Sequence, residues 1–97
     1  MKDIKTPSVD EFFSAILTLE SVEECYKYFG GVCTPKEIQA IAQRFTVARM
    51  LKEKKVYSEI VAATGASTAT ISRVNRSFCY GKDGYKNFFE KLDSLEK

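Results

Sequence analysis

Residues 64–73 of the chain read TGASTATISR, a run of mostly small side chains with no charge before its final arginine. Short apolar helical patterns lie on both sides of its centre, at residues 58–63 and 70–74. Gly65 suits a tight turn, and Ser67 is a favoured residue for capping the start of a helix. The stretch therefore predicts a helix-turn-helix whose second helix is capped by Ser67.

Three apolar side chains of this motif are expected to lock its two helices together: Val61, Ile71 and Val74. The residues at the start of the second helix are then expected to face outward: Thr68, Ala69, Thr70 and Ser72. Small outward groups have a physical use, because a recognition helix enters the DNA major groove by its N-terminus and bulky groups would hold it away. Hydroxyl groups can bond to bases or phosphates, and methyl groups can contact thymine.

Two arginines continue the second helix. Arg73 and Arg76 would place positive charge near the walls of a DNA groove. An ordinary turn between two helices, in which Ser67 and its neighbours only cap, is the plainer interpretation of the glycine and the serine alone. The combination of small residues, hydroxyl groups and arginines inside a basic segment favours DNA binding.

The charge distribution is uneven along the chain. Residues 1–33 carry three lysines against six acids, residues 34–82 carry nine lysines and arginines against three acids, and residues 83–97 carry three lysines against four acids. A local basic field around the motif suits a polyanionic partner. The alternative is a solvated face, with three lysines between residues 52 and 55 at a helix C-terminus, where cations are favourable.

Helix-start signals recur elsewhere. Ser8 and Ser21 each precede a glutamate by three residues and fit the capping box, and Thr34-Pro35 places proline at the first helical position. Gly30-Gly31 is expected to end the helix that follows Ser21. Apolar residues repeat at helical spacing, and no segment of strand length alternates with a period of two. The chain is therefore predicted to be all-α.

The composition argues against catalysis. The chain has no histidine, which removes Ser-His and Cys-His nucleophile pairs, and it lacks GxxxxGK[ST] and GxGxxG loops. We expect no enzyme activity, no cofactor and no metal site. Three cysteines without CxxC spacing are typical of free thiols in a reducing cytosol. No secretory signal or membrane-spanning run is visible, so the expected location is cytoplasmic.

Three features over residues 34–95 point to a known family: a T-P-x-E helix start at Thr34, an arginine at Arg44, and the string G-A-x-x-A-T-I-[ST]-R ending at Arg73. By these features the chain resembles the tryptophan repressor family, and its YerC/YecD-type branch most of all. The resemblance implies a tryptophan-repressor-like helical bundle with a central helix-turn-helix. It also implies an intertwined homodimer that presents two recognition helices to a palindromic operator.

We expect one helical domain over residues 1–97. Within it, residues 1–33 would supply dimerisation helices, 34–56 the core helix, 57–80 the helix-turn-helix and 81–97 a C-terminal helix. Wide apolar faces in the first segment suit a dimer interface, because a short chain with many large apolar groups often completes its core by oligomerising.

The resemblance implies a ligand pocket as well. The family's corepressor indole lies between two arginines that match Arg44 and Arg73, and Thr34 matches a position lining the pocket. The tryptophan repressor has a glycine against the ligand ring, where this chain has Val74. Its isopropyl group would fill the slot, so we expect that tryptophan does not bind. Another small ligand or none remains open, as do plainer roles in which Arg44 pairs with an acid and Arg73 contacts phosphate.

Tyr57 and Ser58 match DNA-contacting positions of the family, although the segment before them is one residue shorter here. We therefore expect a sequence-specific DNA-binding transcriptional regulator of the repressor type, with double-stranded DNA and a second copy of the chain as partners. One alternative is a helix-turn-helix fold that serves as a protein-interaction module. Another is a repressor that depends on tryptophan or another small corepressor. The expected DNA-binding residues are Tyr57, Ser58, Ser67, Thr68, Ala69, Thr70, Ser72, Arg73 and Arg76.

Overall fold

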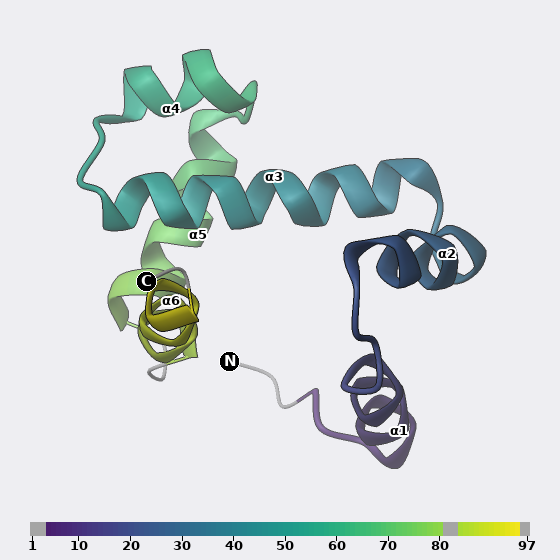
Figure 1. The fold of residues 1–97 in the computed structure, drawn as a ribbon. Helices are drawn as coiled ribbons and strands as arrows, with labels where there is room; N and C mark the ends of the chain where they lie inside the picture. Colours follow the sequence, from purple (N-terminus) through teal and green to yellow (C-terminus); the bar gives the residue numbers. More distant parts are fainter. Residues whose placement is uncertain (1–3, 81–83, 96–97) are drawn as a thin grey trace. The chain divides into compact units, whose positions relative to one another are not determined.

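The computed structural model describes residues 4–80 and 84–95, and its regular structure in these ranges is entirely helical (Figure 1). This confirms the predicted all-α class. None of the described helices combines the length and apolarity needed to cross a membrane. The parts of the expected terminal segments at 1–3, 81–83 and 96–97 lie outside the described residues. The helices are α1 (Pro7–Ile16), α2 (Val22–Val32), α3 (Pro35–Lys52), α4 (Tyr57–Thr64), α5 (Thr68–Tyr80) and α6 (Gly84–Leu95).

The chain forms two compact units, residues 1–35 and 36–97. In the first unit, α1 is capped by Thr6, whose hydroxyl oxygen accepts a hydrogen bond from the Val9 amide at 3.1 Å. The predicted cap at Ser8 is therefore wrong, because Ser8 is the second residue of the helix. Pro7 explains the earlier start, since a proline lacks the amide proton that the first helical position leaves unpaired.

Helix α2 begins as predicted, with the Ser21 hydroxyl accepting from the Glu24 amide at 3.1 Å. Its predicted end is wrong, because the helix continues through Gly30-Gly31 to Val32. A glycine ends a helix when it adopts a positive φ, and neither of these two does so. The helix instead stops before Thr34-Pro35, since the residue before a proline is disfavoured in the helical conformation.

Aromatic rings join the two helices of the first unit. The Phe12 ring of α1 lies 6.4 Å from Tyr28 and 6.3 Å from Phe29 of α2, between ring centroids. No residue of either helix is buried, and large apolar side chains such as Leu17 and Tyr26 are 84% and 75% exposed. The described chain therefore leaves much apolar surface of this unit uncovered.

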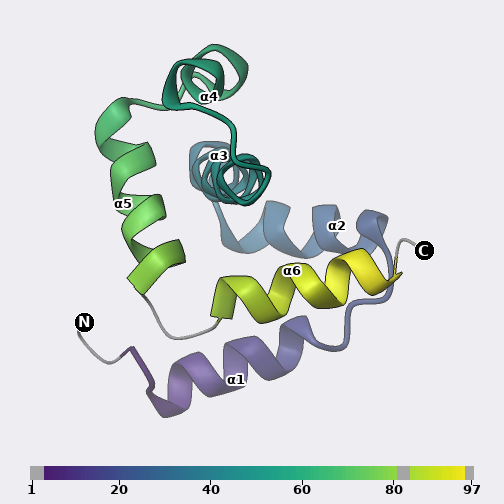
Figure 2. The same cartoon turned by 90° about the vertical axis from the view of Figure 1, so that its left-hand side faces the viewer.

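In the second unit, α3 is the central helix. Helices α4 and α6 lie on opposite sides of α3, and α5 runs past α3 from one side to the other (Figure 2). This arrangement lets α3 support both helices of the helix-turn-helix.

The core of the second unit is built from α3, the helix-turn-helix and α6. Ile71 and Val74 are buried as predicted, but Val61 is 38% exposed and Ile60 is buried in its place. The two residues are adjacent, so only one of them can face the core from a short helix, and the sequence pattern favoured the wrong one. Among the residues whose burial is described, the buried side chains are Val47, Ala48, Ile60, Ala66, Ile71, Val74 and Phe89.

Helix α6 is anchored to α3 through Phe89, whose ring centroid lies 5.7 Å from that of Phe45. The Lys52 ammonium donates a hydrogen bond to the Asp93 carboxylate and lies 5.8 Å from the Phe89 ring centroid. At the end of α6, the Leu95 side chain is 83% exposed and so lies outside this core.

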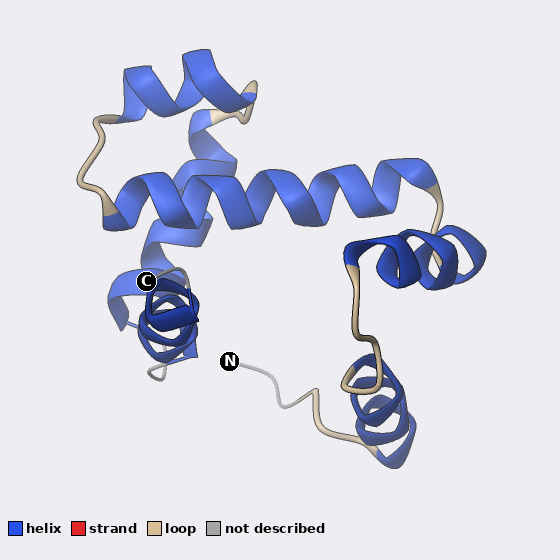
Figure 3. Cartoon of the chain, in the orientation of Figure 1, coloured by secondary structure: helices blue, strands red, loops and turns tan. Residues whose placement is uncertain are grey.

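The loop between α3 and α4, tan in Figure 3, contains an unusual residue just after its start. Lys54 has a φ of 61°, the left-handed conformation that normally favours glycine. The amides of Lys54 and Lys55 donate to the carbonyls of Leu51 and Met50, each at 3.0 Å. This is the hydrogen-bond pairing of a Schellman helix end, here with a lysine at a cost on the order of 1 kcal/mol relative to glycine.

The burial of Ile60 gives a test of the fold. Ile60→Ala removes a fully buried side chain and should lower the free energy of unfolding by about 2–5 kcal/mol. Val61→Ala, the adjacent matched control, should change it by no more than about 0.5 kcal/mol, because that side chain is exposed. Urea denaturation of both variants measures the difference. Equal losses from both would contradict this packing of α4.

Candidate nucleic-acid interface

The turn between α4 and α5 depends on Gly65. Its φ of 72° is left-handed, and its amide donates to the Val61 carbonyl at 2.9 Å. A Cβ at this position would have open space around it, so the backbone conformation, and not crowding, favours glycine. The hydroxyl of Thr64 donates to the Ile60 carbonyl at 2.8 Å and accepts from the Ala66 amide at 3.1 Å. These bonds satisfy backbone groups that the turn would otherwise leave unpaired.

Ser67 precedes the first residue of α5, as predicted from the sequence. Its hydroxyl oxygen accepts from the Thr70 amide at 3.1 Å, the bond expected of a helix cap. The same hydroxyl donates to the Thr70 side-chain oxygen, also at 3.1 Å. Two of the expected site residues are thus brought into direct contact, and Thr70 is partly committed to the cap.

The outer surface of α5 largely matches the expectation. Thr68, Ala69 and Ser72 are exposed, so their small side chains form the accessible surface at the start of the helix. Thr70 differs, because it is half-buried. Thr70 therefore contributes to the cap, and Thr68, Ala69 and Ser72 are the accessible side chains.

Arg73 and Arg76 follow on the same helix, and both are exposed. Within the described residues, neither guanidinium has an acidic side chain within ion-pairing distance. Their charge is therefore available to an external anion. Lys52 of the same basic segment is engaged with Asp93 instead.

Tyr57 and Ser58 are the first two residues of α4, and both are exposed. Val56 caps this helix without a side-chain hydrogen bond. Because Tyr57 and Ser58 begin α4 and Gly65 follows its last residue, these two side chains lie at the opposite end of α4 from the turn.

The residues expected to line a ligand pocket belong to different units of the chain. Thr34 belongs to the first unit, whereas Arg44, Arg73 and Val74 belong to the second. Arg44 is exposed, and Val74 is only 4% exposed within the apolar core. In the part of the chain that is described, no acidic residue pairs with Arg44, and no cluster of acidic and cysteine side chains is placed to hold a metal ion.

Gln43 is a supporting residue that the sequence patterns did not reveal. Its side-chain amide on α3 donates to the Thr64 carbonyl at 3.1 Å and so ties the end of α4 to the central helix. A polar residue beside an apolar stripe is ordinary on a helix, and only the fold shows that it reaches the turn.

Comparison with known proteins places these features in context. The family described as Trp repressor protein matches residues 7–93. The uncharacterized protein YerC of Bacillus subtilis (strain 168) is 46% identical over 93 residues, covering 96% of this chain and 89% of YerC. The crystal structure of a TrpR-like protein from Eubacterium eligens superposes with a TM-score of 0.89 at 54% identity, covering 97% of each chain. A crystal structure of a protein from Staphylococcus aureus superposes with a TM-score of 0.87 at 47% identity, covering 93% of this chain and 90% of the other chain.

The Ser67 cap can be tested by its effect on stability. Ser67→Ala removes both hydrogen bonds to Thr70 and should lower the free energy of unfolding by about 1 kcal/mol. Ser67→Asn retains a capping oxygen and should stay close to the wild-type value. Urea denaturation distinguishes the two. A wild-type stability for Ser67→Ala would show that the cap does not hold the start of α5.

Proposed function

Because the chain belongs to the Trp repressor protein family, we propose that it is a cytoplasmic, sequence-specific DNA-binding regulator of transcription that acts as a homodimeric repressor on a palindromic operator. The observation that carries the proposal is the exposed, capped start of α5 with two available arginines. The protein acts by binding and not by catalysis.

The chemistry of α5 fits base recognition. Thr68, Ala69 and Ser72 offer short hydroxyl and methyl groups, which allow a helix to approach base edges closely. Arg73 and Arg76 lie further along the helix and suit phosphate groups at the groove walls. Tyr57 and Ser58 are assigned to the phosphate backbone beside the groove, where the first helix of such a motif crosses. Ser67 and Thr70 complete the proposed contact set while forming the cap.

Homodimer formation is supported by the apolar surface of the first unit. Neither α1 nor α2 has a buried residue, although both carry large apolar side chains. A second copy of the chain would cover this surface, and a two-fold dimer would present two α5 helices to successive major-groove sites about 34 Å apart.

The effector proposal rests on Val74. This side chain occupies the position where the tryptophan repressor has glycine, and it is buried against the core of the helix-turn-helix. A packed interior has no spare volume for an indole where the valine already lies. We therefore expect DNA binding without tryptophan, with Arg44 and Arg73 left to another small ligand or to none.

The rival function is a helix-turn-helix used to bind another protein. The exposed basic side chains of α5 favour DNA, because they can neutralise phosphate groups. Neutralising phosphates releases condensed counterions, so the affinity for DNA should fall as the salt concentration increases. A duplex affinity that does not respond to salt would favour the rival.

DNA recognition predicts different effects for two side chains of α5. Thr68→Ala should change which sequences are preferred, because base contacts carry specificity, and one mismatched base pair typically costs about 1–3 kcal/mol. Arg76→Ala should weaken binding to all sequences alike, because phosphate contacts position the protein without reading the sequence. Selection from random DNA followed by affinity measurements tests both. Unchanged preference and affinity in both variants would contradict this face of α5 as the interface.

The buried Val74 predicts that L-tryptophan produces no measurable heat of binding in calorimetry and leaves DNA affinity unchanged. Val74→Gly, which removes the isopropyl group, serves as the matched comparison. Tight tryptophan binding by the unmodified protein would contradict the steric account and would make the chain a corepressor-dependent switch.

A further inference from the structure

We propose that the turn between α3 and α4 is a second phosphate-binding element, in which Lys54 contacts the DNA backbone beside the groove that α5 enters. This inference rests on the proposed function and extends it to residues outside the helix-turn-helix. It concerns the strength of DNA binding and not the choice of sequence, since phosphate contacts are independent of sequence.

The backbone of the turn favours a glycine at this position. Lys54 has a φ of 61°, and the bonds from the amides of Lys54 and Lys55 close the helix end around it. Glycine adopts this conformation without strain, whereas a side chain with a Cβ resists it. The chain nevertheless carries lysine here. An observed backbone outlier of this kind is a reason to look for a role of the side chain.

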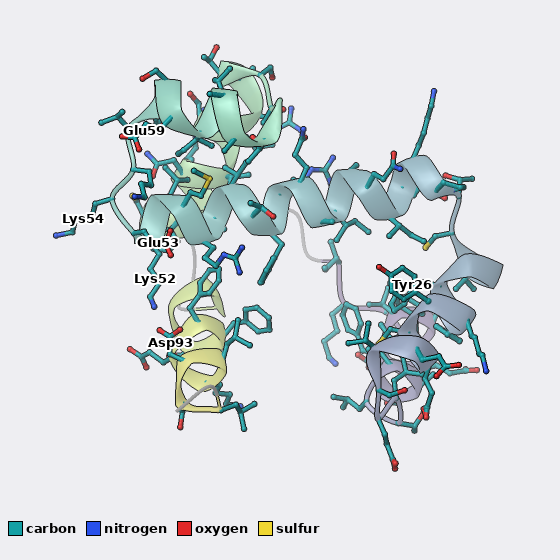
Figure 4. The ribbon with its side chains drawn as sticks, turned by 45° about the horizontal axis from the view of Figure 1, so that its top comes forward. Tyr26, Lys52, Glu53, Lys54, Glu59 and Asp93 are labelled. Atoms are coloured by element: carbon teal, nitrogen blue, oxygen red, sulfur yellow. The ribbon has the colours of Figure 1, made fainter. Side chains whose placement is uncertain are left out.

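The lysines around the turn differ in whether they pair with an acidic side chain. Lys52 is turned toward Asp93 and pairs with it, whereas Lys54 projects away from the helices (Figure 4). Lys54 and Lys55 are exposed, and among the described residues neither pairs with Glu53 or another acid. An exposed cation without an internal partner is suited to an external anion.

The length of α4 sets how far the Lys54 charge lies from the start of α5, the proposed recognition helix. The turn precedes α4 and the cap of α5 follows it, so the eight residues of α4 and two short connecting segments, at 55–56 and 65–66, separate Lys54 from Ser67. Eight helical residues span about 12 Å, and the major groove is about 12 Å wide. When the start of α5 lies between the walls of the groove, each wall is about half a groove width away, so α4 is long enough to carry the turn out to the phosphates of a wall.

The proposal is tested with Lys54→Gly, Lys54→Arg and a control, Lys91→Ala. Gly suits the left-handed backbone and removes the charge, Arg retains the charge, and Lys91 is an exposed lysine of α6, on the other side of α3 from α4. The probe is a labelled duplex of arbitrary sequence, titrated at several salt concentrations. Urea denaturation of each variant is measured in parallel.

Lys54→Gly should bind the duplex several-fold more weakly while being at least as stable as the wild type. The slope of log affinity against log salt should become shallower by about 0.9 for each phosphate that the variant leaves unneutralised, or about 1.8 for a dimer that presents the turn twice. Lys54→Arg and Lys91→Ala should retain the wild-type slope. If the wild type binds DNA and Lys54→Gly keeps its affinity and slope, or if Lys91→Ala weakens binding equally, this inference is overturned while the proposed function stands. Failure of the wild type to bind any duplex overturns both.

Discussion

The left-handed turn at Gly65 and the Ser67 hydroxyl beside it determine how α4 and α5 meet. The Gly65 amide closes α4 on the Val61 carbonyl, and Ser67 opens α5 by accepting from the Thr70 amide. These local bonds set the direction in which α5 leaves the turn. Thr64 and Gln43 then bind the same segment to its own helix and to α3. A recognition surface requires this fixed geometry, because a shift of the helix would move every side chain that could reach a base.

The core and the proposed interface are two faces of the same short helix. Ile71 and Val74 are buried on one side of α5, while Thr68, Ser72 and Arg76 are exposed, so helical periodicity separates packing from recognition. Most of the buried core belongs to the helix-turn-helix itself, with α3 and α6 completing it. The stability of the second unit and the shape of its outer surface therefore depend on the same few residues.

Much of this fold could be predicted from local chemistry. The all-helical class, the turn at Gly65 and the caps at Ser21 and Ser67 follow from short-range hydrogen bonding, which residue type largely decides. Predictions failed where neighbouring residues compete: Pro7 moved the start of α1 away from the Ser8 cap, and Ile60 took the core position given to Val61. The half-buried state of Thr70 and the reach of Gln43 depend on how helices pack, which no local pattern contains.

We propose that two copies of α5, each held by its cap and its core, read one double-stranded sequence together. Selecting bound duplexes from a random pool with the full chain tests this most directly. We expect enrichment of a two-fold symmetric sequence whose half-sites are separated by one turn of DNA, about 34 Å between centres. Recovery of no common sequence would contradict sequence-specific recognition, and recovery of a single unpaired half-site would contradict recognition by a dimer.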